Sequence, residues 1–369
     1  MADFSAFTGP SAEWLALEPT LPPVPDLSIE DLKKAANKLR EEAAAQALIT
    51  EGLTTQVTIQ DHTIPTRDNQ TLQASTYRPA GIPPSSSHRL PIYIHLHGGG
   101  FLFGTLRSED AICARIVATS SSSSHPVIVL NINYRHTPEH TYPTAWNDVE
   151  DAFHWLHDHV DSLGGDPARV VVGGISAGAW LTASLVLAQH RGEDEALAAR
   201  PRIVGQVLMI PCVVWGEKNH ARQVERLRDP SVDSYVQNAG APILPVERAR
   251  LFTGLLKVED HGQGRELELE EDRRLSPGVA TGEEVRGLPP AVFGVAGRDP
   301  LRDEGLLFAR LLSENGVPTD VNVFSGLPHG FRRYGDKLSE SKRWDAVVFR
   351  GIQWALGGPA ANTFEIKLE

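Results

Sequence analysis

The sequence has few cysteines, no long apolar run and a deficit of positive charge. Only two cysteines, Cys113 and Cys212, occur among 369 residues. One disulfide is possible, but two thiols in so long a chain are more typical of a reducing compartment. No apolar run reaches the length of about 18 residues that a membrane-spanning helix needs. No basic segment followed by an apolar stretch opens the chain, as a secretory signal would. These absences predict a cytoplasmic protein without a membrane span.

The charge balance is acidic. Lys and Arg number 35 against 47 Asp and Glu, which gives a net charge of −12. Such a chain lacks the excess of basic residues that attracts nucleic acid, so no nucleic-acid partner is predicted. Hydrophobic residues make up 41% and charged residues 22% of the chain, as in ordinary folded proteins. The length suits one large α/β domain with insertions, or two smaller domains.

Short apolar runs alternate with helical segments from residue 90 onward. Strands that are apolar almost throughout, separated by helices, predict a mostly parallel sheet covered on both faces. Two earlier segments alternate apolar and polar residues and predict an antiparallel pair at one edge. The expected strands are 54–60, 71–77, 92–96, 127–132, 170–173, 204–210, 291–295 and 321–324, and the clearest helices are 29–46 and 148–159.

Two short segments carry the strongest chemical signal. The run HGGGF over 97–101 follows one expected strand, and GISAG over 174–178 follows another and opens a helix. A serine on a strand-to-helix turn needs tiny neighbours, here Gly174 and Gly178, so that its hydroxyl can project from the sheet. The glycine loop can aim bare backbone N–H groups at a developing negative charge. Together these segments predict acyl transfer with Ser176 as the nucleophile.

Two later loops can supply the rest of a catalytic triad. A nucleophilic serine needs a general base, and that base needs an orienting acid. Asp299 and His329 each follow a later strand, in the chain order expected for this topology. Asp303 and Glu304 are alternatives for the acid. Their position favours negative charges at the start of a helix instead.

The remaining histidines predict no metal site. His95 and His97 are spaced as alternate residues of a strand, and His136 with His140 has the spacing of a metal pair. Neither pair is accompanied by a carboxylate or cysteine at ligand spacing. We therefore expect neither a metal nor another cofactor.

In this order, the motifs resemble the hormone-sensitive-lipase-like branch of the α/β-hydrolases. The resemblance covers about residues 70–357 and implies an α/β-hydrolase fold, with a central sheet of about eight strands and a helical cap. It implies carboxylesterase activity with Ser176 as nucleophile, His329 as base and Asp299 as orienting acid. The oxyanion hole that it implies consists of Gly98, Gly99, Gly100 and Ala177.

The resemblance also divides the chain. Residues 1–50 and 212–285 match the family's cap, and residues 51–211 and 286–369 match its hydrolase core. The long connection after the strand at 204–210 is itself typical of an inserted subdomain. An acidic run at 266–272 within it is interpreted as a solvated helix face.

Three positions depart from the usual family pattern around the serine, namely Ile175, Ala179 and Trp180. They leave the expected triad intact but bear on the substrate. Apolar candidates for a substrate pocket favour small to medium, fairly hydrophobic esters. These candidates are Leu102, Phe103, Trp180 and Trp215.

Rival functions remain at this stage. An acyltransferase or lyase could use the same site, because an acyl-enzyme can be intercepted by an acceptor other than water. A non-catalytic small-molecule receptor is disfavoured because all three triad residues are present. A nucleotide-binding loop at 98–100 is disfavoured because the glycine spacing is wrong. A homodimer is a further open possibility.

Overall fold

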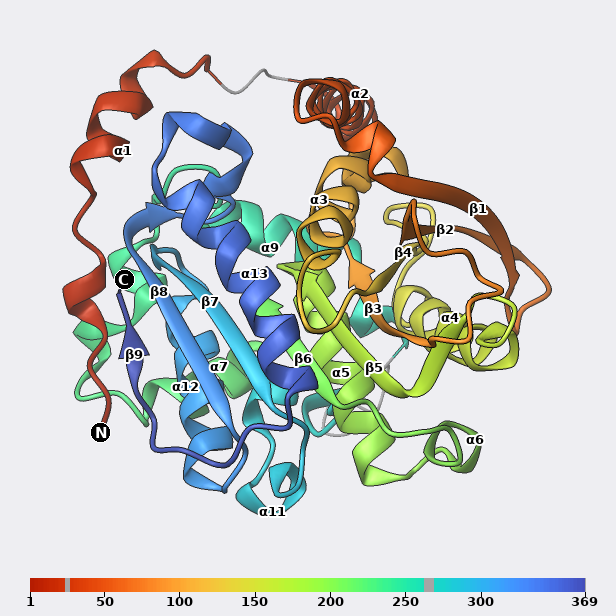
Figure 1. Cartoon of the computed structure of the whole chain (residues 1–369). Coiled ribbons are helices and arrows are strands. Elements are labelled where there is room, and N and C mark those ends of the chain that lie inside the picture. The colour runs from red at the N-terminus through yellow and green to blue at the C-terminus, as the bar shows by residue number, and fades with distance from the viewer. Residues whose placement is uncertain (24–26, 262–268, 369) are drawn as a thin grey trace.

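One nine-stranded sheet forms the centre of the molecule (Figure 1). The computed structural model describes residues 1–23, 27–261 and 269–368. The strand order is β1-β2-β4-β3-β5-β6-β7-β8-β9. The β1–β2 and β2–β4 pairs are antiparallel, and all other neighbours are parallel. The strands are β1 (Val57–Pro65), β2 (Thr71–Pro79), β3 (Leu90–Leu96), β4 (Ile128–Asn133), β5 (Gly165–Ile175), β6 (Gly205–Met209), β7 (Ala291–Arg298), β8 (Thr319–Pro328) and β9 (Ile366–Lys367).

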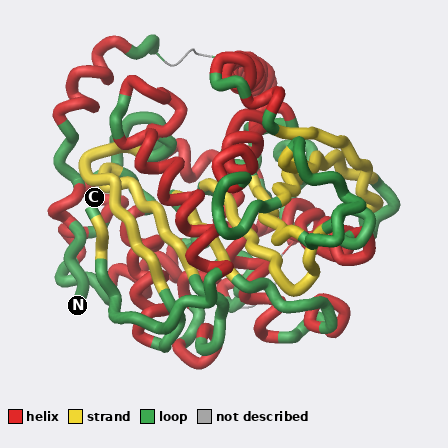
Figure 2. Tube along the Cα trace, in the orientation of Figure 1, coloured by secondary structure: helices red, strands yellow, loops and turns green. Residues whose placement is uncertain are grey.

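Helices cover both faces of this sheet, as the tube view also shows (Figure 2). The helices α3 (Asp110–Ser120) and α13 (Glu340–Leu356) bury their apolar residues in one core cluster. The helices α4 (Thr144–His159), α5 (Ala177–Arg191) and α12 (Arg302–Glu314) bury theirs in a second cluster on the other face. The molecule therefore has three layers.

The residue pattern explains these layers. In β5, Val170 and Val172 belong to one core cluster and Val171 to the other, because successive strand residues point to opposite faces. Helix α13 buries residues at helical spacing, among them Trp344, Val348 and Ile352, and so presents a single apolar stripe to the sheet.

The remaining helices lie outside the sheet layers or at their ends. Helix α2 (Ile29–Thr50) packs on α3 and on the loop after β3. Four α-helices of the described chain lie between β6 and β7. They and the other remaining helices are α1 (Ala12–Leu17), α2 (Ile29–Thr50), α6 (Glu195–Ala198), α7 (Glu217–Val224), α8 (Ser234–Gln237), α9 (Val246–Leu255) and α11 (Gly282–Val285).

The N-terminus joins the segment between β6 and β7. The backbone N–H of Ala2 donates to the Arg226 carbonyl at 2.9 Å, and the N–H of Arg228 donates to the Ala2 carbonyl at 2.7 Å. No helix within the described ranges has the length and apolar character needed to cross a bilayer. The acidic run expected at 266–272 lies partly outside the described residues.

The predicted fold class is confirmed, and the differences concern element ends. The structure has nine strands where about eight were expected, because the two-residue β9 adds to the far edge. Strand β1 begins at Val57 and not near residue 54, since Leu53–Thr55 form a 3-10 turn. Helix α2 continues to Thr50, beyond the expected end at 46.

Candidate active site

Ser176 occupies the sharp turn between β5 and α5. Its φ of 55° and ψ of −115° lie in a region that non-glycine residues rarely adopt. The turn is possible because the residues on either side of it, Gly174 and Gly178, have no side chain. A Cβ on Gly174 would lie 2.3 Å from the carbonyl carbon of Gly178, and a Cβ on Gly178 would lie 2.0 Å from the Leu96 carbonyl oxygen. The serine hydroxyl is thus held at the carboxyl end of the sheet.

Ser176, His329 and Asp299 form one hydrogen-bonded chain. The Ser176 Oγ lies 2.9 Å from Nε2 of His329, and Nδ1 of His329 lies 2.7 Å from Oδ2 of Asp299. Because the carboxylate can only accept, Nδ1 carries the proton and Nε2 is free to accept from the serine. Asp299 is 1% exposed and His329 is 7% exposed, so the pair is shielded from bulk water.

The Asp299 carboxylate is held by its surroundings. Its Oδ1 accepts a hydrogen bond from the backbone N–H of Leu301 at 2.9 Å. The backbone carbonyl of Asp299 accepts a hydrogen bond from Nδ2 of Asn238 at 3.0 Å. The hydroxyl of Ser234 donates to the Pro300 carbonyl at 2.6 Å. Residues of and beside α8 therefore fix the loop that carries the acid, and nothing local in the sequence predicts these contacts.

The glycine loop after β3 faces the same serine. Gly99 has a φ of 143° and Gly100 a φ of 62°, which favour glycine at both positions. Within the described residues, the backbone N–H groups of Gly99, Gly100 and Ala177 donate no hydrogen bond. Ala177 also opens α5, whose N-terminal end carries partial positive charge. These groups can receive an oxyanion without breaking an existing bond.

Helix α2 holds the glycine loop from outside. Nη1 and Nη2 of Arg40 both donate to the Gly98 carbonyl, each at 3.1 Å. One turn earlier, Oδ1 of Asn37 accepts the backbone N–H of Gly104 at 2.8 Å. Another turn earlier, Nζ of Lys33 donates to a backbone carbonyl of the loop after β4. Sequence reasoning misses this face of α2, because polar residues on a helix are usually solvated.

Arg40 is anchored in turn by a buried carboxylate. Its Nη2 lies 2.9 Å from Oε1 of Glu109, whose Oε2 lies 3.0 Å from Nε2 of His95. Burial opposes ionisation of Glu109, but the hydrogen bond with His95 and the positive charge of Arg40 lower the pKa of Glu109 overall. Glu109 is therefore an anion that fixes the Arg40 guanidinium.

The histidines considered for metal binding have other partners. Nε2 of His97 and Nε2 of His136 lie 3.2 Å apart, and the His97 ring stacks on Tyr134. Burial lowers the pKa of His97 to about 4 and lowers the pKa of His136 as well, so both rings are neutral at pH 7. In the part of the chain that the structure describes, no three His, Cys, Asp or Glu side chains are grouped to hold a metal.

The expected substrate-pocket residues fall into two groups. Phe103 and Trp215 are partly exposed, whereas Leu102 is fully buried and Trp180 is 1% exposed. The Trp180 indole donates to the Arg274 carbonyl at 3.1 Å. Trp180 lies in the first turn of α5, so this hydrogen bond ties the helix after Ser176 to the segment between β6 and β7, and the side chain lies beneath the surface.

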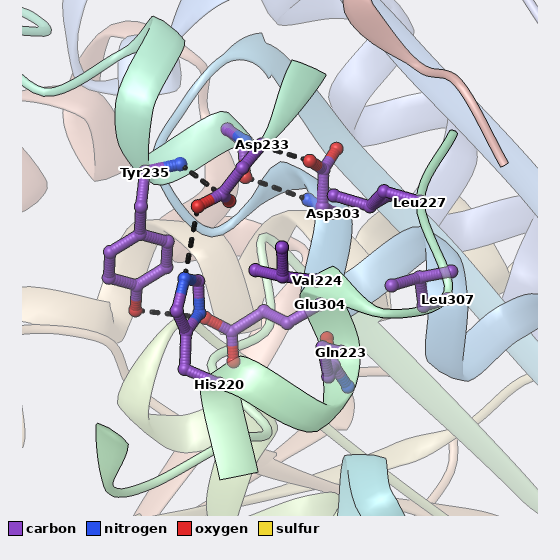
Figure 3. A pocket seen from close by; sticks show the side chains of 10 residues that line it. His220, Gln223, Val224, Leu227, Asp233, Tyr235, Asp303, Glu304 and Leu307 are labelled. Carbon is purple, nitrogen blue, oxygen red and sulfur yellow. Dashed lines mark hydrogen bonds and ion pairs between the residues drawn. The ribbon is translucent and has the colours of Figure 1, made fainter. Parts of the chain in front are cut away.

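Asp303 and Glu304 lie in the first turn of α12, as expected, but both are buried. Oε2 of Glu304 accepts the backbone N–H groups of Val213 and Val214 at 2.6 and 2.8 Å. Figure 3 shows Glu304 beside a cavity of about 10 Å³, which is room for about one water. Burial raises the pKa of Glu304 to about 8, against the backbone hydrogen bonds. Within the described residues, neither carboxylate forms a hydrogen bond with His329, whose Nδ1 pairs with Asp299.

Comparison with known proteins places this site in context. The model of a family described by its alpha/beta hydrolase fold matches residues 93–333. Esterase LipI of Mycobacterium tuberculosis is 35% identical over 245 residues, 66% of each chain. The ethyl acetate hydrolase of Pseudomonas putida is 30% identical over 295 residues, 80% of this chain and 82% of that protein.

Solved structures show the same architecture. The hyperthermophilic esterase of the archaeon Pyrobaculum calidifontis is 27% identical to this chain. It superposes with a TM-score of 0.71 and covers 95% of this chain and 100% of its own.

Proposed function

The chain belongs to the hormone-sensitive-lipase-like family of α/β-hydrolases, and from this membership we propose that it is a carboxylesterase acting through Ser176. Its relatives include proteins named esterase, carboxylesterase and ethyl acetate hydrolase. The observation that supports the proposal most directly is the hydrogen-bonded chain from Ser176 through His329 to Asp299. The substrate class is small to medium, fairly hydrophobic esters.

The reaction follows from the roles of these groups. His329 takes the Ser176 proton as Oγ attacks the ester carbonyl. The new oxyanion accepts hydrogen bonds from the N–H groups of Gly99, Gly100 and Ala177, while Gly98 completes the loop. The C–O bond to the alcohol then breaks, and the alcohol leaves with the proton from His329. Water, activated by the same imidazole, hydrolyses the acyl-enzyme and releases the acid.

The segment between β6 and β7 and the N-terminal helices form the cap in this proposal, as residues 1–50 and 212–285. Phe103 packs edge-on against Phe252 of α9 at 5.7 Å between ring centroids, which supports an apolar surface above the glycine loop. Phe103 and Trp215 are the candidates for substrate contact, and Leu102 and Trp180 support the site from below.

Compartment and assembly complete the proposal. Cys113 and Cys212 are unpaired, which supports a cytoplasmic location. A homodimer stays a prediction, and sedimentation velocity at several concentrations tests it.

Hydrolysis of neutral 4-nitrophenyl esters of increasing chain length tests the activity. We expect short and medium chains to be turned over. Replacing Ser176 by Ala should lower kcat by a factor on the order of a million. Residual activity of more than a few per cent in S176A would contradict the proposal.

A further inference from the structure

An arginine stands beside the residue that follows the proposed base. Arg333 lies in the 3-10 segment Phe331–Lys337 after His329. Its Nε donates to the Gly330 carbonyl at 3.2 Å, and a Cβ on Gly330 would lie 3.2 Å from its Nη2. The adjacent Arg332 forms an ion pair with Asp345 at 2.6 Å. Arg333 is exposed, and its Nη1 and Nη2 have no hydrogen-bond partner among the described residues.

A second arginine approaches from α9. Arg248 lies one helical turn before Phe252, so both side chains share one face of the helix. The Phe252 ring is 2.3 Å from where a Cβ of Gly100 would lie, which places this face of α9 over the glycine loop. The Arg248 guanidinium donates through Nη1 to the Ile243 carbonyl. Its Nε and Nη2 have no hydrogen-bond partner among the described residues.

The charged side chains described around Arg333 and Arg248 carry an excess of positive charge. Although the Arg333 side chain is exposed, the chain packed around it removes part of its hydration, and this loss lowers the pKa of Arg333 most. The neighbouring Tyr334 opposes this shift, and the positive charges of Arg40 and Arg248 lower the pKa further. Arg40 is paired with Glu109. Neither Arg248 nor Arg333 has a carboxylate within 4.0 Å in the described chain. In a chain with 47 acidic against 35 basic residues, two such arginines beside one site are an uncompensated positive patch.

We propose that Arg333 and Arg248 form an anion site at the mouth of the Ser176 site, and that the preferred substrate is an ester carrying a carboxylate. The inference rests on the proposed esterase function and changes its substrate class in one respect, by adding a carboxylate to an otherwise apolar ester. A guanidinium binds a carboxylate through parallel N–H groups, and Arg333 has both Nη groups available. The carboxylate can belong to the acyl or the alcohol part, since Arg333 adjoins the base and Arg248 the glycine loop.

Such a site acts mainly on binding. The carboxylate is remote from the reacting carbonyl, so its contacts are similar in the ground state and the transition state and should lower KM more than they raise kcat. The attraction should weaken with salt, because exposed charges are screened within about 8 Å at physiological ionic strength.

Two matched substrate pairs test this inference. The first compares 4-nitrophenyl hydrogen adipate with 4-nitrophenyl hexanoate, which differ by a charge on the acyl part. The second compares 4-acetoxybenzoate with its methyl ester, which differ by a charge on the alcohol part. In at least one pair, we expect kcat/KM to favour the anionic ester by about tenfold at low salt. The preference should shrink in 0.5 M NaCl.

Variants then assign the preference to these residues. R333Q and R248Q should each raise KM for the preferred anionic ester severalfold, with a much smaller change for its neutral partner. R350Q is the matched control, because Arg350 is exposed and, among the residues that the structure describes, its Nε likewise donates only to a backbone carbonyl, that of Ala346 in its own helix. R350Q should change KM for neither the anionic nor the neutral ester.

The outcomes separate the two proposals. If neutral esters are hydrolysed as well as or better than both anionic ones, the anion site is wrong while the esterase function stands. Equal effects of R333Q on both members of a pair would also contradict it. If no ester is hydrolysed and Ser176 is not acylated, the proposed function itself fails.

Discussion

Arg40 and Gly98 are joined by two hydrogen bonds from one guanidinium to one carbonyl oxygen, each 3.1 Å long. The two residues are 58 positions apart. Because the peptide between Gly98 and Gly99 is planar and trans, its C=O and N–H point in opposite directions. Fixing the carbonyl therefore fixes the direction of the Gly99 N–H, which is a proposed oxyanion donor. Arg40 is a positioning residue in this account.

Replacing Arg40 by Ala should lower kcat with little change in KM. The Gly99 donor is loosened and not removed, so we expect a loss of about tenfold, less than the roughly hundredfold or more for deleting one donor. R40K should recover part of kcat, since one ammonium can still reach the carbonyl. Steady-state kinetics on a neutral ester measures both constants.

The control for this prediction is K34A. Lys34 lies on α2 and is largely exposed, and within the described ranges its only ion-pair partner is Glu30. If R40A folds with an unchanged melting temperature and keeps wild-type kcat, Arg40 does not position the loop.

Gly178 should be intolerant of any side chain. A Cβ there would lie 2.0 Å from the Leu96 carbonyl oxygen and 2.6 Å from that of His97, and backbone atoms cannot yield as a flexible side chain can. G178A should cost about 1–3 kcal/mol of stability or more and displace the serine turn. We expect kcat to fall far more than the melting temperature alone would explain.

The matched substitution is G254A. Gly254 lies in α9, and a Cβ there meets nothing within 4 Å. Thermal unfolding and kcat should show G254A close to wild type or slightly more stable, since alanine favours helix. Similar losses in both variants would show that the elbow is not specially crowded.

Glu304 should make stability depend on pH. Its pKa is raised to about 8 in the folded protein against an ordinary value near 4.5. Between about pH 5 and 8, the unfolded chain has lost this proton and the folded chain retains it. Stability should therefore fall as pH rises through that window, by up to about 1.4 kcal/mol per pH unit from this group.

The E304Q variant removes this titration while keeping an oxygen for the N–H groups of Val213 and Val214. We expect the urea midpoint of E304Q minus that of wild type to be larger at pH 8.5 than at pH 5.5. The exposed E314Q on the last turn of α12 is the control, and its difference from wild type should not depend on pH in this way. If the E304Q difference is also independent of pH, Glu304 is ionised throughout.

The triad candidates are readable from sequence because each stands just after an apolar strand. Ser176 follows β5, Asp299 follows β7 and His329 follows β8, and the carboxyl ends of parallel strands meet at one edge. The choice of Asp299 over Asp303 needs only the start of a helix to be recognised. Local pattern therefore suffices for the fold class and for the candidate residues.

The supports of the site are not readable in this way. The contacts of Arg40 with Gly98 and of Asn238 with Asp299 join segments 58 and 61 residues apart, and no periodicity marks either side chain. The burial of Glu304 likewise depends on the segment between β6 and β7 folding back onto α12. Such partners follow from tertiary packing, which a single sequence does not display.

The most direct measurement is covalent labelling with a fluorophosphonate, followed by peptide mapping. The account predicts one adduct per chain, on the peptide that carries Ser176. It predicts slower labelling in H329A and D299N, and none in S176A. An adduct on another residue, or equal labelling of S176A and wild type, would contradict the claim that this serine is the nucleophile.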